Sequence, residues 1–196
     1  MSSADVFEKN GCVRVNEFID LHTVSIVSQY LENRIRRGEW VEGNEGVQAA
    51  SKLFYYADPL IEALMLACKA GVEEVTGKEL LPTYSYSRVY QPGEELVSHT
   101  DRPSCEVSVT VNIATKGELS PIYMQYKDNP VEEHFLSPGD AVVYKGCEAK
   151  HWRKPLTPNQ LNVQFMLHYV DKNGPNTEFI KDKRPAYGMS DKTRRL

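Results

Sequence analysis

The sequence is poor in the features that mark secreted, membrane and disulfide-bonded proteins. Its four cysteines lie far apart and form no Cys-x-x-Cys pair, so we expect free thiols rather than a disulfide framework. No apolar run approaches the roughly 20 residues that a membrane-spanning helix needs. Residues 1–10 lack the hydrophobic stretch of a signal peptide. We therefore expect a soluble, cytoplasmic protein without membrane contacts.

Positive charge is also scarce. Lys and Arg number 23 against 27 Asp and Glu, a net charge of −4, whereas nucleic-acid-binding proteins usually carry a basic excess. The locally basic stretch from Lys181 to Arg195 also contains acidic residues, and we expect it to be a solvated tail rather than a binding arm. Nucleic acid is therefore an unfavoured partner.

Length and patterning predict one domain of mixed character. A chain of 196 residues buries enough surface to fold without disulfides or a structural metal. We expect a single domain over residues 1–196, with a helical N-terminal part (1–80), a β-core (81–171) and a polar tail (172–196). In the helical part, Asp20 is a suitable N-cap for a helix that runs to Arg37. Asp58 followed by Pro59 marks the start of a second helix, which ends at Gly77.

The β-core is predicted from a change to a two-residue period at residue 81. Short apolar stretches alternate with turn signals such as Gln91-Pro-Gly93 and Ser137-Pro-Gly-Asp140. Regularly spaced short strands favour a sandwich or jelly roll, with the N-terminal helices covering one outer face of an α+β fold. The eight expected strands are Thr83–Tyr90, Leu96–Thr100, Glu106–Ala114, Pro121–Gln125, Glu133–Leu136, Ala141–Tyr144, Lys150–Lys154 and Leu161–Val170.

Two of the five histidines occupy places that suggest a metal site. His99 and Asp101 are two residues apart at the end of an expected strand, so their side chains point to the same side. His151 begins a later strand and could supply a third ligand. Two imidazoles and one carboxylate leave open positions on a metal, an arrangement that suits non-haem Fe(II). A His-x-Asp pair alone also occurs often as two partly buried polar residues that bind no metal. The surrounding sequence is therefore needed to tell a metal site from such a pair.

Those surroundings resemble a known superfamily. The segments are Tyr86-Ser-Arg-Val-Tyr90-Gln-Pro-Gly-Glu-Glu-Leu-Val-Ser-His99-Thr-Asp101, then Ser137-Pro-Gly-Asp-Ala-Val-Val-Tyr144, then His151-Trp-Arg-Lys-Pro155. Together they resemble the Fe(II)/2-oxoglutarate-dependent dioxygenases, most closely the prolyl-hydroxylase-like group, over residues 81–171. The resemblance implies a double-stranded β-helix in which His99, Asp101 and His151 bind Fe(II). It also implies 2-oxoglutarate and O2 as co-substrates, with ascorbate a further candidate, and no catalytic side chain beyond the metal centre.

One part of the family pattern is missing. The family usually places an Arg or Lys on the final core strand, to pair with the far carboxylate of 2-oxoglutarate. The strand Leu161–Val170 contains no cation, and Asn162 or Gln164 stands in the expected place. A dicarboxylate in a partly dry pocket needs a positive partner, and a guanidinium fits it best. We expect Arg88 or Arg153 to take the place of the missing cation. Arg88 shares a strand face with Tyr90, which matches a pocket tyrosine of the family, and Arg153 lies two residues past His151 on the same side. A surface position or a substrate contact is the alternative for either arginine.

The resemblance implies hydroxylation of an unactivated C–H bond. Prolyl-type protein or peptide substrates come first, with a free amino acid or small molecule close behind. Two alternatives stay open: an oxidative demethylase acting on nucleic acid, and a non-catalytic, cupin-like metal-binding β-barrel. The missing cation is the feature that keeps the second alternative open. Ser108, Thr110 and Asn112 share a strand face that either lines the pocket or contacts solvent. We expect Cys105 to be a small core residue near the site, and a position of His168 just outside the ligand set is a less favoured possibility.

Overall fold

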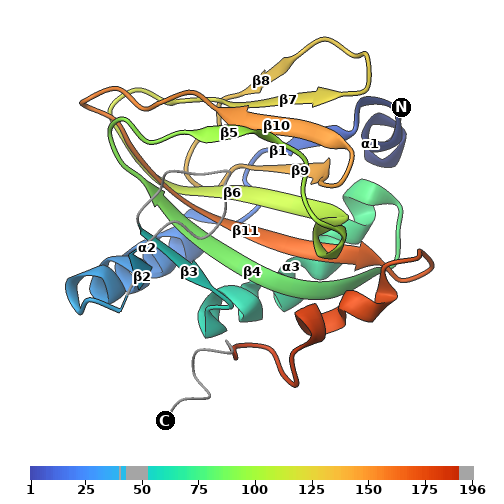
Figure 1. The fold of residues 1–196 in the computed structure, drawn as a ribbon, viewed down its shortest axis with the longest axis horizontal. Helices are drawn as coiled ribbons and strands as arrows, with labels where there is room; N and C mark the ends of the chain where they lie inside the picture. Colours follow the sequence, from blue (N-terminus) through green and yellow to red (C-terminus); the bar gives the residue numbers. More distant parts are fainter. Residues whose placement is uncertain (40, 43–52, 190–196) are drawn as a thin grey trace.

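The computed structural model describes residues 1–39, 41–42 and 53–189 and shows two antiparallel sheets with helices on one side (Figure 1). The larger sheet has the strand order β1-β9-β6-β11-β4-β3-β2 and the smaller one β5-β10-β7-β8. An α+β fold built on two antiparallel sheets is thereby confirmed. Within the described residues, none of the helices is long and apolar enough to cross a membrane.

The strands of the larger sheet are β1 (Cys12–Val15), β9 (Ala141–Lys145), β6 (Val107–Lys116), β11 (Leu161–Asp171), β4 (Leu80–Tyr90), β3 (Leu53–Tyr56) and β2 (Val41–Glu42). Those of the smaller sheet are β5 (Leu96–His99), β10 (Ala149–Arg153), β7 (Ile122–Tyr126) and β8 (Glu132–His134). The helices are α1 (Ser3–Asn10), α2 (Leu21–Arg36) and α3 (Pro59–Thr76), with 3₁₀ segments η1 (Pro103–Cys105) and η2 (Thr177–Lys183). All eight expected strands are present, with ends shifted by a few residues.

Capping residues explain the two long helices. The Asp20 carboxylate accepts a hydrogen bond from the Thr23 amide at the start of α2. Asp58 accepts from the amides of Leu60 and Ile61 at the start of α3, where Pro59 occupies the first turn. Gly77 ends α3 with φ of 69°, a left-handed conformation that glycine adopts without strain. Both predicted helices are confirmed.

The N-terminal 80 residues are less uniformly helical than expected. They also contain the short helix α1, which Ser2 and Asp5 begin with a capping box, and the strands β1, β2 and β3. β1 joins the larger sheet by pairing with β9, which lies far away in the sequence, whereas β3 pairs with β4 and β2 with β3. Strands of two to four residues carry too little periodicity to be recognised locally.

The two faces of the larger sheet differ in polarity. One face packs its apolar side chains against the three helices; this core includes Phe7, Val27, Leu31, Ile61, Met65, Val109, Val111, Phe165 and Leu167. The opposite face, turned toward the smaller sheet, carries buried polar side chains, among them Ser108, Thr110 and Asn112. The helices thus cover one outer face, as expected, and a polar interior remains between the sheets.

The described part of the C-terminal segment is not the solvated tail that its composition suggests. It packs along β4, where Arg184 is buried and donates to the Glu62 carboxylate at 2.5 Å. Arg184 also donates to the carbonyl oxygens of Thr83 and Met189. Glu62 accepts further hydrogen bonds from the backbone amides of Gly188 and Ser85, so its carboxylate is fully partnered. Residues 190–196 of the expected tail lie outside the described residues.

Candidate metal centre

Three potential ligands converge between the two sheets. His99 ends β5, Asp101 follows two residues later, and His151 lies opposite His99 in the register of β10 and β5. The Nε2 atoms of His99 and His151 are 3.6 Å and 3.5 Å from Oδ1 of Asp101. The three ligand atoms all lie within 4.8 Å of one another. The structure therefore brings together the three residues that the sequence motif suggested.

Both imidazoles are oriented by their own backbone. Nδ1 of His99 lies 2.7 Å from the Val97 carbonyl oxygen, and Nδ1 of His151 lies 3.0 Å from that of Ala149. A carbonyl oxygen can only accept, so each Nδ1 carries the proton. With Nδ1 engaged in this way, Nε2 is the nitrogen of each ring that faces Asp101 and is placed to bind a metal.

Hydrogen bonds of its side chain and its backbone hold Asp101 in place. Ser108 donates to its Oδ2 at 2.9 Å, and the Asp101 amide donates to the Gly146 carbonyl oxygen at 2.8 Å. Burial alone would raise the pKa of Asp101, but the two imidazoles outweigh it and hold this pKa well below its usual range. The carboxylate is therefore ionised and available to a cation.

His168 and Cys105 lie on another side of Asp101 and form with it a second group whose ligand atoms are within 4.8 Å of one another. Nδ1 of His168 is 2.9 Å from the Ser108 hydroxyl, and the Cys105 thiol is 3.0 Å from the Tyr84 hydroxyl. Burial lowers the pKa of His168 to about 4 and raises that of Cys105, so both side chains are neutral near pH 7. Ser108 thus connects the His168 imidazole to the Asp101 carboxylate, a candidate ligand. Strand pairing creates this contact, and the local sequence does not reveal it.

The donor set fits a hard or borderline divalent cation with open coordination positions. Separations of 3.5 and 3.6 Å are too long for hydrogen bonds, yet they suit three atoms that share one cation at roughly 2.0–2.2 Å. Two histidines and one carboxylate on one side form the facial arrangement typical of non-haem Fe(II).

Two buried guanidinium groups lie in the same polar interior. Arg153 follows His151 by two residues on β10, and Arg88 lies on β4 across from Gln164 of β11. Their guanidinium carbons lie 5.5 Å and 5.7 Å from the centre of the Tyr90 ring. Arg153 donates to Gln164 at 3.1 Å and to the Ser120 carbonyl oxygen, and Arg88 donates to the Tyr86 hydroxyl at 3.3 Å.

Neither guanidinium is neutralised within the described part of the chain. No carboxylate there forms an ion pair with Arg88 or Arg153, and the Nε of each is buried without a hydrogen-bond partner. Asn162 also has a buried, unpartnered Oδ1, while its amide nitrogen donates to Asn112 at 2.9 Å. Buried unpaired positive charge is costly, so the two guanidinium groups fit a bound anion, whereas the free Asn162 oxygen can only accept a hydrogen bond.

Comparison with known proteins gives the fold a class. No protein-family model and no curated protein sequence matches the chain. Among solved structures, a Pseudomonas putida prolyl-4-hydroxylase is similar, with 14% identity, a TM-score of 0.69 and 87% of this chain and 98% of that one covered. A Trichoplax adhaerens prolyl hydroxylase, in complex with a peptide of hypoxia inducible factor, has 15% identity, a TM-score of 0.70 and coverage of 87% and 88%. HygX from Streptomyces hygroscopicus, with nickel and 2-oxoglutarate bound, has 13% identity, a TM-score of 0.65 and coverage of 86% of each chain. The chain thus has the fold of the 2-oxoglutarate-dependent oxygenases, as its motifs suggested.

Proposed function

We propose that the protein is an Fe(II)- and 2-oxoglutarate-dependent oxygenase that hydroxylates an unactivated C–H bond. Its two sheets would form the double-stranded β-helix of such enzymes, with iron held by His99, Asp101 and His151. One observation carries the proposal: three ligand atoms converge in the same interior as two buried arginines without a carboxylate partner in the described residues. A metal centre paired with unneutralised cations fits a dicarboxylate co-substrate.

The chain's own residues would bind and orient that co-substrate. Arg153 is our first candidate for the far carboxylate, because it shares a strand and a side with the ligand His151. Arg88 is the second candidate, across the Tyr90 ring, and Asn162 would complete the polar lining. With iron and O2 bound, 2-oxoglutarate supplies the two electrons for hydroxylation and becomes succinate and CO2, with ascorbate a candidate reductant.

The substrate class is proposed from the fold neighbours and from charge. Neighbouring structures include a prolyl hydroxylase with a peptide and HygX with hygromycin B. We place a prolyl-type protein or peptide first and a free amino acid or small molecule second. A net charge of −4 disfavours nucleic acid as the substrate.

The direct test starts without oxygen. The chain with Fe(II) and 2-oxoglutarate should develop a weak visible charge-transfer band, and admission of air should produce succinate. His99→Ala and Asp101→Ala should abolish the band without unfolding the chain. A mass-spectrometric search for products heavier by one oxygen atom, across peptides and amino acids, would identify the substrate. Absence of both band and succinate would instead support a metal-binding protein without oxygenase activity.

The arginine assignment needs its own measurement. Loss of the cation that pairs with 2-oxoglutarate should weaken its apparent affinity by at least about tenfold, or roughly 1.4 kcal/mol. Arg153→Ala and Arg88→Ala are compared with Lys154→Ala, a neighbouring exposed cation that contacts the Tyr123 ring. If neither arginine variant weakens 2-oxoglutarate binding more than the lysine control, the assignment is wrong.

A further inference from the structure

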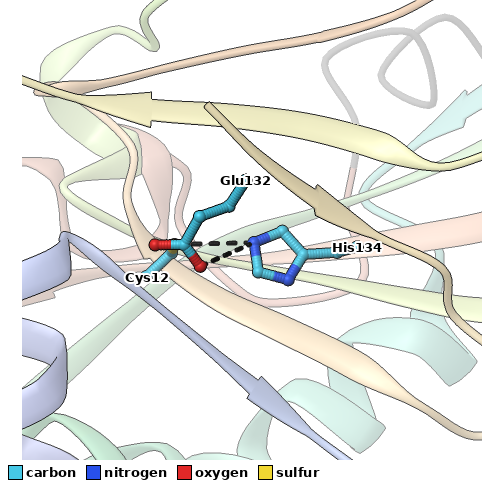
Figure 2. Close-up of side chains that lie close together, drawn as sticks. All are labelled: Cys12, Glu132 and His134. Carbon is cyan, nitrogen blue, oxygen red and sulfur yellow. Dashed lines mark hydrogen bonds and ion pairs between the residues drawn. The ribbon is translucent and has the colours of Figure 1, made fainter. Parts of the chain in front are cut away.

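A second cluster of potential metal ligands lies at the edge of both sheets, away from the proposed iron centre. Figure 2 shows the side chains of Cys12, Glu132 and His134 turned toward one another. Cys12 begins β1 at one edge of the larger sheet, and the other two lie on β8 at one edge of the smaller sheet. Glu132 and His134 are two residues apart on a strand and project to the same side.

The atoms of the cluster have the separations of ligands that share one ion. Nε2 of His134 is 3.6 Å from Sγ of Cys12 and 3.7 Å from Oε2 of Glu132. All three ligand atoms lie within 4.8 Å of one another. A tetrahedral Zn²⁺, at roughly 2.3 Å from sulfur and 2.0–2.1 Å from nitrogen, places these two atoms about 3.6 Å apart.

Two members of this cluster are buried, unlike a chance group of polar residues on the surface. Cys12 and His134 are 3% and 7% exposed, and Cys12 packs with Ile122, Met124 and Val142. Burial and the nearby Glu132 carboxylate raise the pKa of Cys12 to about 12. Arg14, two residues from Cys12, forms an ion pair with Asp140 at 2.9 Å.

We propose that Cys12, Glu132 and His134 form a zinc site that joins the edge strand β1 of one sheet to the edge strand β8 of the other. Binding forms a bond between Zn²⁺ and the Cys12 sulfur and breaks its S–H bond, and the proton passes to solvent without redox change. Glu132 is partly exposed, so the remaining coordination position faces water.

The donor sets give the two sites different preferences. Thiolate sulfur favours Zn²⁺ over the harder cations, whereas a His₂Asp set suits Fe(II). A cation here would be shared by three side chains that already converge on one point, a buried thiol, a carboxylate and an imidazole. The consequence is structural: one ion would connect two sheets at an edge, where backbone pairing does not join them.

Cobalt is the probe that reports a sulfur ligand directly. The full-length His99→Ala/Asp101→Ala variant, freed of metal with a chelator, removes the proposed iron centre from the measurement. Titration with Co²⁺ should give an intense thiolate-to-cobalt absorption band at one equivalent, and Zn²⁺ should abolish the band by displacement. Zn²⁺ alone should release about one proton per ion and raise the melting temperature.

Three variants assign the ligands. Cys12→Ser should eliminate the cobalt–thiolate band, and Glu132→Gln, at a partly exposed position, should weaken Zn²⁺ binding by more than about tenfold without unfolding the chain. Cys68→Ser, at a cysteine of α3 outside every ligand cluster in the described residues, should leave both measurements unchanged. The proposal is overturned if no band forms, if the band persists in Cys12→Ser, or if Glu132→Gln binds Zn²⁺ as tightly as its parent. These outcomes do not depend on the oxygenase activity.

Discussion

Gly146 is the residue on which the placement of Asp101 depends most closely. A Cβ atom at this position would lie 2.1 Å from the Cys105 carbonyl oxygen and 2.7 Å from both Asp101 Oδ2 and Ser108 Oγ. The Gly146 carbonyl oxygen also accepts the Asp101 amide. The absence of a side chain here therefore lets the backbone approach the proposed ligand and its hydrogen-bond donor.

Gly146→Ala should displace Asp101 and disturb the centre. We expect Fe(II) affinity to fall by more than tenfold and the free energy of unfolding to drop by about 1–3 kcal/mol, because the added carbon meets backbone that cannot move away. Isothermal titration with an O2-inert divalent metal and urea unfolding measure the two effects. Gly71→Ala is the matched control: a Cβ there meets nothing within 4 Å in helix α3, and we expect equal or greater stability. Unchanged metal affinity in Gly146→Ala would contradict the argument.

At the scale of elements, Asp140 fixes the turn before β9. Its carboxylate accepts from the Ser137 and Glu17 amides, each at 3.0 Å, and from Arg14 at 2.9 Å. Burial would raise the pKa of Asp140, but these donors outweigh it and lower this pKa below the usual value. The sequence revealed a Pro-Gly-Asp turn here, but the partners on the N-terminal segment come from the fold.

Asp140→Asn should destabilise the protein in a pH-dependent way. A carboxyl with a lowered folded pKa contributes stability above its unfolded pKa of about 3.9, and this contribution is lost as pH falls through the folded value. We expect a loss of about 1–3 kcal/mol at pH 7 and a smaller difference from the parent at pH 3. Urea unfolding at both pH values checks this, with Asp128→Asn in an exposed turn as the control. An equal loss at both pH values would show that the charge is irrelevant.

The C-terminal segment provides a second prediction at this scale. Arg184→Met leaves the Glu62 carboxylate buried without its cation, which should cost about 3–5 kcal/mol. Glu62→Leu/Arg184→Met should recover part of that loss, because no buried charge remains. Lys183→Met removes an exposed ion pair with Glu178 and should change stability by less than about 0.5 kcal/mol. Chemical denaturation compares the four proteins; an Arg184→Met loss no larger than that of Lys183→Met would contradict the burial argument.

Some elements of the fold could be predicted from the sequence, and others could not. Helices α2 and α3 were predictable because Asp20, Asp58 and Pro59 are local signals. The metal-ligand motif was recognisable because its spacing and turns are local too. The pairing of β1 with β9, and the burial of Arg184 against Glu62, bring together residues more than a hundred positions apart. Local patterns carry no information about such pairings.

At the scale of the whole molecule, the polar interior lies between two sheets that meet there through side chains. His99, His151 and Arg153 come from the smaller sheet, whereas Arg88 and Asn162 come from the larger one. A metal and a dicarboxylate bound between them would therefore contact both sheets at once. Their binding should therefore raise the free energy of unfolding of the whole protein, not only stabilise one segment.

Metal and 2-oxoglutarate together should raise the melting temperature of the protein in air when an O2-inert ion such as Mn²⁺ or Ni²⁺ replaces Fe(II). With each ligand at about 100 times its Kd, linkage predicts about 2.7 kcal/mol of stabilisation per ligand. A chelator should reverse the effect completely. Succinate, which lacks the keto group, serves as the ligand control and should stabilise the protein less. No shift with either ligand would argue against an anion site between the sheets.

The orientation of the two histidines has a consequence for how this centre can change over evolutionary time. Their Nδ1 partners are main-chain carbonyl oxygens two residues earlier on the same strands, those of Val97 and Ala149. No codon change at Val97 or Ala149 can delete these acceptors, as it could delete an aspartate or asparagine side chain. The surrounding sequence is therefore free to diverge, while any descendant that retains the two strands and their histidines inherits the same tautomers.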